Sequence, residues 1–285
     1  ENRIMASFSA GTGLRLASKP KLICFDKDGT LGDARQGLRR WAEEMARKVS
    51  DFSGSPPDAV NKFYQVAGFD VSTGCVTGAT SLLAAGTWQQ IISETAKVVG
   101  VDDSVVAQWS AEIGDVHSLD PPVSDLDLPH LISTLKRLGL KVCLCTSDTR
   151  SSTYGALKNW GIYSLFDSIV TCDDVEPGFE KPSPAPLQNL CRLHGVQPCE
   201  AIIIGDTTGD TLMGSRAGAG LTIGVLSGSG SPEALLSNGA NMLLPDVGYL
   251  KKFLDGVSVE ENKTIVRSTS SMEEEVKRKV RKISA

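Results

Sequence analysis

The sequence predicts an α/β fold: a doubly wound parallel sheet forms the core, and a four-helix block is inserted after the first strand. Two patterns support this prediction. From residue 129 onward, short apolar runs alternate with segments of helical periodicity, which is typical of a parallel sheet covered by helices on both faces. Before that point, helical patterns follow one another between residues 34 and 118. A composition of 41% hydrophobic and 22% charged residues agrees with a globular protein.

Residues 1–20 are expected to form a flexible leader. No acidic residue occurs from Met5 to Lys21, whereas serine and basic residues recur. This composition is weakly similar to that of an organellar transit peptide, and a disordered leader would look the same. The chain has seven cysteines, an odd number, and no C-x-x-C pair occurs among them. This pattern favours free thiols in a reducing compartment. We therefore expect a cytoplasmic protein, with a mitochondrion or plastid as the alternative if the leader is a transit peptide.

The first strand and the helical block come next along the chain. An apolar run at residues 21–25 predicts a buried strand, which ends in the sequence DKDGTL at residues 26–31. Apolar residues then recur every three or four positions, which predicts helices around residues 38–49 and 60–67 and over 81–99 and 103–117, with a loop at 68–80. We expect residues 34–118 to be a separate helical domain.

The remainder of the core is expected to alternate helices with strands. The helices are predicted at 129–138, 152–160, 184–194 and 210–217, and the strands at 140–146, 168–171, 201–204, 221–225 and 241–244. The core domain would therefore comprise residues 21–33 and 119–257. Residues 258–285 are a polar extension, in which glutamates precede lysines and arginines by four positions, as in a solvated helix.

Polar residues follow three of the predicted strands. Asp26 and Asp28 come after the first strand, Thr146 and Ser147 after the second, and Asp206 and Asp210 after the strand at 201–204; Lys181 precedes the helix that leads into that strand. Ligands of an open parallel sheet bind at the carboxyl ends of its strands, so we expect these side chains to meet at one edge.

The chemistry of this set points to phosphoryl transfer. Four carboxylates in one place repel each other unless a cation lies among them, and oxygen ligands without His or Cys select a hard ion such as Mg²⁺. A carboxylate beside that ion can attack phosphorus, and a second carboxyl can move the proton of the leaving group. The backbone amides of a tight glycine turn and of a helix N-terminus can hold the remaining oxygens.

Four motifs in order give the chain a family resemblance. They are DKDGTL at residues 26–31, the hydroxyl at Thr146, KPSP at residues 181–184, and GDTTGD at residues 205–210. With them, residues 21–250 resemble the haloacid dehalogenase superfamily, specifically phosphatases of the phosphoglycolate phosphatase and β-phosphoglucomutase type. This resemblance implies a Rossmann-like core and identifies the helical block as a small cap domain.

The resemblance also implies a role for each residue. Asp26 would be the nucleophile that forms an aspartyl-phosphate, and Asp28 would be the general acid and base. Mg²⁺ would be bound by Asp26 and Asp206, with Asp28 contributing its backbone carbonyl and Asp210 binding the ion or orienting it through water. The phosphoryl oxygens would be held by the residues Gly29, Thr146, Ser147 and Lys181. The implied activity is hydrolysis of a small phosphorylated metabolite, with a phosphoglycolate-like compound as the first candidate.

Several alternatives stay open on the sequence alone. A phosphomutase shares all four motifs, a phosphonate-cleaving enzyme would need a cap lysine such as Lys62 or Lys97, and a binding protein could keep the fold without turnover. Asp28 disfavours dehalogenation, because the dehalogenases of the family lack this residue. Asp210 could instead be the N-cap of its helix. A net charge of −5 argues against nucleic acid as a partner, and no run of about 18 apolar residues is present that could span a membrane.

Overall fold

The central sheet has six parallel strands. The computed structural model describes residues 14–16, 18–52, 54–77, 81–86, 88–114, 120–255, 257–260, 263–266 and 270–283. The strands of the sheet are β2 (Leu22–Phe25), β5 (Lys141–Cys145), β6 (Ser168–Val170), β7 (Ala201–Gly205), β8 (Leu221–Val225) and β9 (Met242–Leu244). Their spatial order is β6-β5-β2-β7-β8-β9. Every pairing in it is parallel, which confirms the predicted doubly wound α/β fold.

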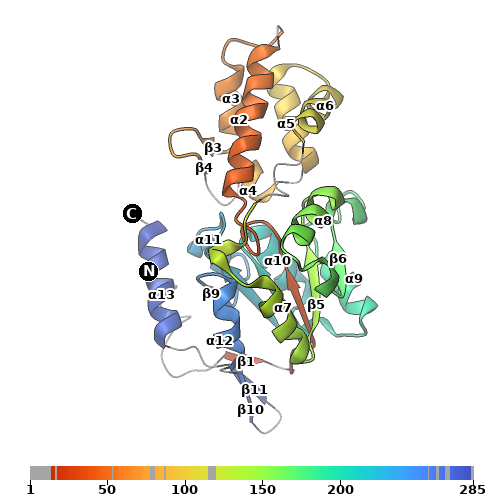
Figure 1. The fold of residues 1–285 in the computed structure, drawn as a ribbon, viewed down its shortest axis with the longest axis vertical. Coiled ribbons are helices and arrows are strands. Elements are labelled where there is room, and N and C mark those ends of the chain that lie inside the picture. Colours follow the sequence, from red (N-terminus) through yellow and green to blue (C-terminus); the bar gives the residue numbers. More distant parts are fainter. Residues whose placement is uncertain are drawn as a thin grey trace.

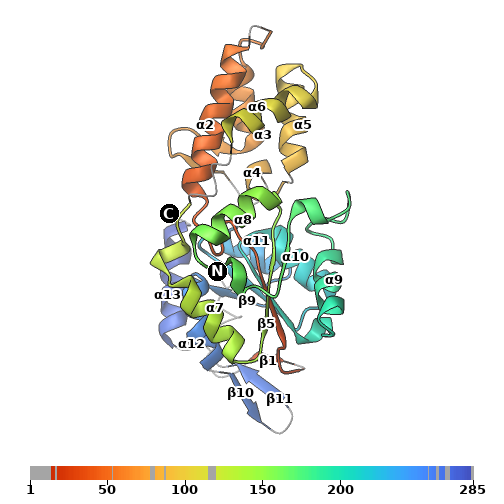
Figure 2. The same cartoon turned by 45° about the vertical axis from the view of Figure 1, so that its right-hand side comes forward.

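Helices cover both faces of this sheet (Figures 1 and 2). Alternate residues of each strand point to opposite faces, so Ile23 and Phe25 of β2 pack with one set of helices, and Leu22 and Cys24 pack with another. The first face holds α7 (Leu128–Arg137), α8 (Arg150–Asn159) and α12 (Leu250–Asp255); the second holds α9 (Ala185–Leu193) and α10 (Thr208–Ala217). Burial on both faces explains why these strands appear in the sequence as continuous apolar runs.

The inserted block contains more elements than predicted. Its described residues form five helices: α2 (Arg35–Asp51), α3 (Ala59–Ala67), α4 (Leu82–Ala85), α5 (Trp88–Val99) and α6 (Asp103–Ile113). The helix predicted at 81–99 is divided because the chain is extended at Gly86. The predicted loop at 68–80 contains a short antiparallel pair, β3 (Phe69–Asp70) and β4 (Cys75–Val76). Residues 115–117, predicted as the end of the last helix, lie outside the described residues.

Two neighbouring connections join this block to the sheet. Asp33 N–H donates to the carbonyl of Pro121 at 2.8 Å, and the indole of Trp160 donates to the carbonyl of Asp120 at 2.8 Å. A β-carbon at Gly32 would lie 2.4 Å from the Trp160 ring, so only glycine fits where the first connection passes this ring. The block therefore lies over the carboxyl ends of the strands (Figure 1).

Some elements were not predicted at all. The strands β1 (Leu14–Leu16), β10 (Val257–Glu260) and β11 (Lys263–Val266) form a separate antiparallel sheet. The predicted leader and polar extension are thus partly joined by strand pairing between distant segments, which no local pattern reveals. The helix α11 (Pro232–Ser237) was not predicted either. The helix α13 (Ser270–Ile283), predicted to be solvated, buries Val276 against Leu243 of β9. Among the described helices, none combines the length and the apolar character needed to cross a bilayer.

Candidate active site

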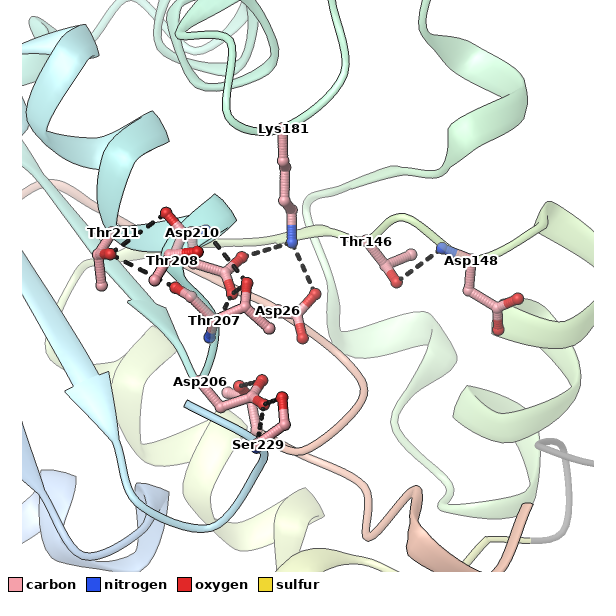
Figure 3. Close-up of polar contacts among 11 residues, drawn as sticks. Asp26, Thr146, Asp148, Lys181, Asp206, Thr207, Thr208, Asp210, Thr211 and Ser229 are labelled. Atoms are coloured by element: carbon pink, nitrogen blue, oxygen red, sulfur yellow. Dashed lines mark hydrogen bonds and ion pairs between the residues drawn. The ribbon is translucent and has the colours of Figure 1, made fainter. Parts of the chain in front are cut away.

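The candidate site lies where β5, β2 and β7 end side by side. Asp26 directly follows β2, Thr146 follows β5, and Asp206 follows β7. The chain order of the strands reverses around β2, and ligands of doubly wound sheets bind at such a point. All three side chains are buried, and they lie close to Lys181 and Asp210 in Figure 3. The structure therefore brings together three of the four predicted acids, Asp26, Asp206 and Asp210, with the predicted lysine.

Lys181 links two of the carboxylates. Its Nζ lies 2.6 Å from Oδ1 of Asp26 and 2.6 Å from Oδ1 of Asp210 (Figure 3). The lysine side chain is only 7% exposed, so it retains little contact with water. Burial alone would lower the pKa of Lys181, but the charges of Asp210 and Asp26 hold this pKa well above its ordinary value. The ammonium group is therefore a fixed positive charge beside the candidate nucleophile.

The helix N-terminus at α10 fixes Asp210. Thr207 is the N-cap, and its hydroxyl and backbone N–H donate to Oδ2 of Asp210 at 2.6 and 3.1 Å. Asp210 is the third residue of the helix and completes a capping box, so the alternative that it is the N-cap is wrong. With Oδ2 held by Thr207, Oδ1 is directed to Lys181.

Asp206 is enclosed by a loop that the sequence analysis did not single out. Its carboxylate accepts hydrogen bonds from the Thr30 hydroxyl at 3.2 Å and from the Ser229 N–H at 2.9 Å. A β-carbon at Gly228 would lie 1.9 Å from Oδ2 of Asp206, which requires glycine there. The Ser/Gly run at residues 227–231, after a predicted strand, was the available signal for this loop.

The acidic cluster carries an excess of buried negative charge. Asp26, Asp206 and Asp210 each offer a carboxylate oxygen within 4.8 Å of the others, and the ammonium group of Lys181 pairs with two of them, Asp26 and Asp210. Burial, followed by the charge of Asp210, raises the pKa of Asp206 to about 7. Burial also raises the pKa of Asp26 well above its ordinary value, although Lys181 opposes this. A hard divalent cation among these oxygens would remove the excess, so the donor set fits such an ion.

Asp28 stands apart from this cluster. Its carboxylate lies 3.0 Å from Nζ of Lys27, and the same ammonium lies 2.6 Å from Asp148. Lys27 is fully buried, and although burial lowers its pKa, the charges of Asp28 and Asp148 hold that pKa above its ordinary value. The Asp28 carboxylate thus lies outside the acidic cluster. Only the backbone carbonyl of Asp28 therefore remains a candidate metal ligand. Sequence reasoning missed Lys27, although its place between two aspartates was visible.

The residues expected to hold phosphoryl oxygens divide into two groups. Thr146 and Ser147 line the central cavity, as does Lys181. The N–H of Gly29, by contrast, donates to the carbonyl of Gly32 at 2.8 Å and is already used in the turn. This geometry therefore gives no support to the expectation that Gly29 binds phosphate, which stays a prediction. Position 29 requires glycine for a different reason: its φ is +76°, and a β-carbon there would lie 2.5 Å from Asp206.

A cavity of about 680 Å³ lies between the sheet and the inserted helices. Asp26, Asp28 and Lys181 lie at its sheet side, and Trp41 and Trp88 lie at its helical side. A cavity of this size can bury a small organic molecule. The lysines considered for phosphonate cleavage do not line it: Lys62 pairs with Asp58, and Lys97 pairs with Glu94.

Comparison with known proteins gives one family. A family model described as haloacid dehalogenase-like hydrolase matches residues 20–218, more than half of the chain. The chain is similar to pyrophosphatase PpaX of Bacillus cereus, with 39% identity over 87 residues, which cover 30% of this chain and 39% of that protein. It is also similar to phosphoglycolate phosphatase of Thiobacillus denitrificans, with 26% identity over 198 residues, which cover 70% of this chain and 80% of that protein.

The solved structures agree in fold. One described as a predicted phosphoglycolate phosphatase from Haemophilus somnus matches with a TM-score of 0.61 at 18% identity, covering 82% of this chain and 98% of the other. At this identity the similarity concerns the fold alone. The first curated relatives, three PpaX pyrophosphatases, are matched over 39%, 40% and 56% of their own length, so the chain spans less than two thirds of each.

Proposed function

This chain belongs to the haloacid dehalogenase-like hydrolase family, and we propose that it is a magnesium-dependent phosphatase that transfers a phosphoryl group first to Asp26 and then to water. One observation carries the proposal. The buried carboxylate of Asp26, at the end of β2, lines the cavity and lies 2.6 Å from the buried ammonium group of Lys181. We also propose that residues 34–118 act as a cap over a core formed by 21–33 and 119–257.

Each step can be assigned to residues at this edge of the sheet. Asp26 attacks phosphorus as the bond to the leaving oxygen breaks, and the carboxyl of Asp28 gives that oxygen a proton. Asp28 then takes a proton from water, whose oxygen attacks phosphorus and releases Asp26. Lys181 and the hydroxyl of Thr146 hold the phosphoryl oxygens. Mg²⁺ bound by Asp26, Asp206, Asp210 and the carbonyl of Asp28 would offset the phosphoryl charge.

The substrate class is a small phosphorylated metabolite. The relatives are named as a phosphoglycolate phosphatase and as pyrophosphatases, and both activities cleave a P–O bond. A phosphomutase would use the same residues and would differ in the acceptor of the phosphoryl group. Phosphonate cleavage has less support, because Lys62 and Lys97 are exposed and ion-paired away from the cavity.

Phosphate release tests this proposal. The protein is expected to release inorganic phosphate from members of a panel of small phosphoesters and phosphoanhydrides in Mg²⁺, and to release none in EDTA. Phosphoglycolate, pyrophosphate and sugar phosphates belong in the panel. Isomerisation of a sugar phosphate without release of inorganic phosphate would show that the protein is a phosphomutase and not a phosphatase. No reaction of any compound would favour a non-catalytic protein.

Gly228→Ala is expected to weaken Mg²⁺ binding. The new β-carbon would lie 1.9 Å from Oδ2 of Asp206, so that carboxylate must move from its position. Mg²⁺ that binds only the folded protein raises Tm, and the rise depends on affinity. We expect Mg²⁺ to raise Tm of the parent by several degrees and to raise Tm of the variant by less than half as much, as measured by differential scanning fluorimetry.

Gly220→Ala is the matched control for this change. A β-carbon at Gly220 would lie 2.1 Å from the carbonyl of Cys199, an equally tight contact away from the acidic cluster. This variant is expected to have a lower Tm in EDTA but the full rise on addition of Mg²⁺. Equal rises in both variants would show that Asp206 does not hold the metal.

A further inference from the structure

The walls of the central cavity differ sharply in chemistry. The sheet side presents the carboxylates, hydroxyls and ammonium group described above. The helical side is formed largely by apolar residues of α2, α4 and α5, which are Leu38, Trp41, Leu83, Trp88, Ile91 and Ile92. A phosphoryl group held at Asp26 would therefore place its leaving group against an apolar wall.

This wall has a defined aromatic corner. The rings of Trp41 and Trp88 meet edge to face, with centroids 5.0 Å apart. The indole N–H of Trp41 donates to the hydroxyl of Ser110 at 3.2 Å, so this polar group is already satisfied within the helical block. Trp88 is half-buried and lines the cavity. Trp41 is only 2% exposed, so the ring of Trp88 presents the aromatic surface that a ligand can contact.

The cavity is poorly suited to a negatively charged leaving group. Among the described residues that line it, Lys181 is the one basic side chain, and Asp26 and Asp210 already engage its ammonium group. Asp28, Asp148 and Asp173 also line the cavity, and the one buried ammonium group of Lys27, which pairs with Asp28 and Asp148, offsets only part of their negative charge. The basic residues Arg39 and Arg40 of the neighbouring helix α2 lie outside the lining and pair with Glu43 and Asp120.

Size points in the same direction. The cavity of about 680 Å³ falls within the range that encloses drug-sized ligands. A two-carbon leaving group would leave most of the apolar wall without contact. A ring-bearing leaving group would cover it.

We infer that the site takes phosphomonoesters of uncharged alcohols that carry an apolar or aromatic ring, in preference to carboxylate-bearing esters such as phosphoglycolate. This inference rests on the proposed function and names its substrate class. The apolar wall supplies affinity for the ring, and the acidic lining discriminates against a second anion.

Four esters separate the two effects. Benzyl phosphate and ethyl phosphate differ in the ring. The compound 4-carboxybenzyl phosphate adds a carboxylate to the benzyl ring, and phosphoglycolate has a carboxylate in place of the methyl group of ethyl phosphate. We expect kcat/KM for benzyl phosphate to exceed that for ethyl phosphate by at least about tenfold, and a carboxylate to lower kcat/KM by at least about tenfold. A preference for phosphoglycolate over benzyl phosphate would overturn the inference and leave the phosphatase proposal intact.

Substitutions in the wall give a sharper test. Leu38→Lys places a cation in the apolar wall and is expected to raise the ratio of kcat/KM for 4-carboxybenzyl over benzyl phosphate by at least about tenfold, a gain that misfolding cannot produce. Trp88→Ala is expected to lower the benzyl-to-ethyl ratio. Trp109→Ala is the control, because Trp109 packs on Phe52 outside the cavity lining and should leave both ratios unchanged. Unchanged ratios in Leu38→Lys and Trp88→Ala would contradict the inference.

A binding measurement keeps the inference separate from turnover. Benzylphosphonate and phosphonoacetate cannot be hydrolysed at an ester bond, and their Kd values for the Mg²⁺-loaded protein can be measured by calorimetry. Tighter binding of benzylphosphonate is expected, and tighter binding of phosphonoacetate would overturn the inference. If no ester is hydrolysed, the phosphatase proposal fails by itself, and these two Kd values still decide which class of compound the cavity prefers.

Discussion

Asp26→Asn is expected to lower phosphate release by roughly 10⁴-fold or more, because the variant loses the nucleophile. The same change removes one of three crowded, buried carboxylates. The pKa of Asp26 is raised by burial, so its charged form is unfavourable in the metal-free fold. We therefore expect Tm in EDTA to stay the same or rise while activity is lost. Steady-state phosphate release and thermal unfolding, measured on the same sample, test both expectations.

Asp167→Asn is the matched control for this variant. Asp167 lies before β6, on the opposite edge of the sheet, where it pairs with Lys136 and Lys141 at 3.2 Å each and accepts the N–H of Val142. Its replacement is expected to lower Tm and leave activity within about twofold, which is usual for a change away from the reacting groups. Activity of Asp26→Asn above about one hundredth of the parent rate would contradict the nucleophile assignment.

Asp28→Asn is expected to lower the rate by about 10²- to 10⁴-fold for alkyl phosphates, because proton transfer to the leaving oxygen is lost. The Asp28 carboxylate is 32% exposed, lines the cavity and lies outside the acidic cluster, which suits a group that exchanges protons with substrate and water. The loss should be much smaller in the burst phase with p-nitrophenyl phosphate, whose leaving group needs no proton. Rapid-quench kinetics with both esters measure the difference.

Asp148→Asn distinguishes proton transfer from positioning. Asp148 shares the ammonium group of Lys27 with Asp28, so this variant keeps the Asp28 carboxyl but removes the second partner of Lys27. We expect a loss of less than about tenfold that is the same for both esters. If Asp28→Asn also slows both esters equally, Asp28 acts through the arrangement of the site and not as the proton donor.

The sequence was sufficient to predict the sheet and most of the acidic site. Strands buried on both faces appear as uninterrupted apolar runs, and residues that follow such runs must meet at one edge of a parallel sheet. Asp26, Thr146 and Asp206 were therefore identifiable without coordinates. Lys181 required the motif as well, since it precedes a helix and does not follow a strand.

Contacts between segments that are distant along the chain could not be predicted from the sequence. The Ser229 N–H reaches Asp206 from a loop after β8, and the Gly29 N–H is used within its own turn. The pairing of β1 with β11 joins the two ends of the chain. The character of the cavity wall depends on which faces of α2 and α5 turn toward the sheet. Helical periodicity marks an apolar face but does not say whether the core or a ligand covers it.

If the phosphoryl group passes through Asp26, the aspartyl-phosphate can be trapped during turnover. The protein is mixed with Mg²⁺ and its best substrate, quenched in acid during turnover, digested with pepsin at low pH and analysed by mass spectrometry. We expect one additional phosphoryl group on the peptide that contains Asp26, absent in Asp26→Asn and in EDTA. A phosphoryl group on another residue, or turnover with inversion of configuration at phosphorus and no modified peptide, would contradict it.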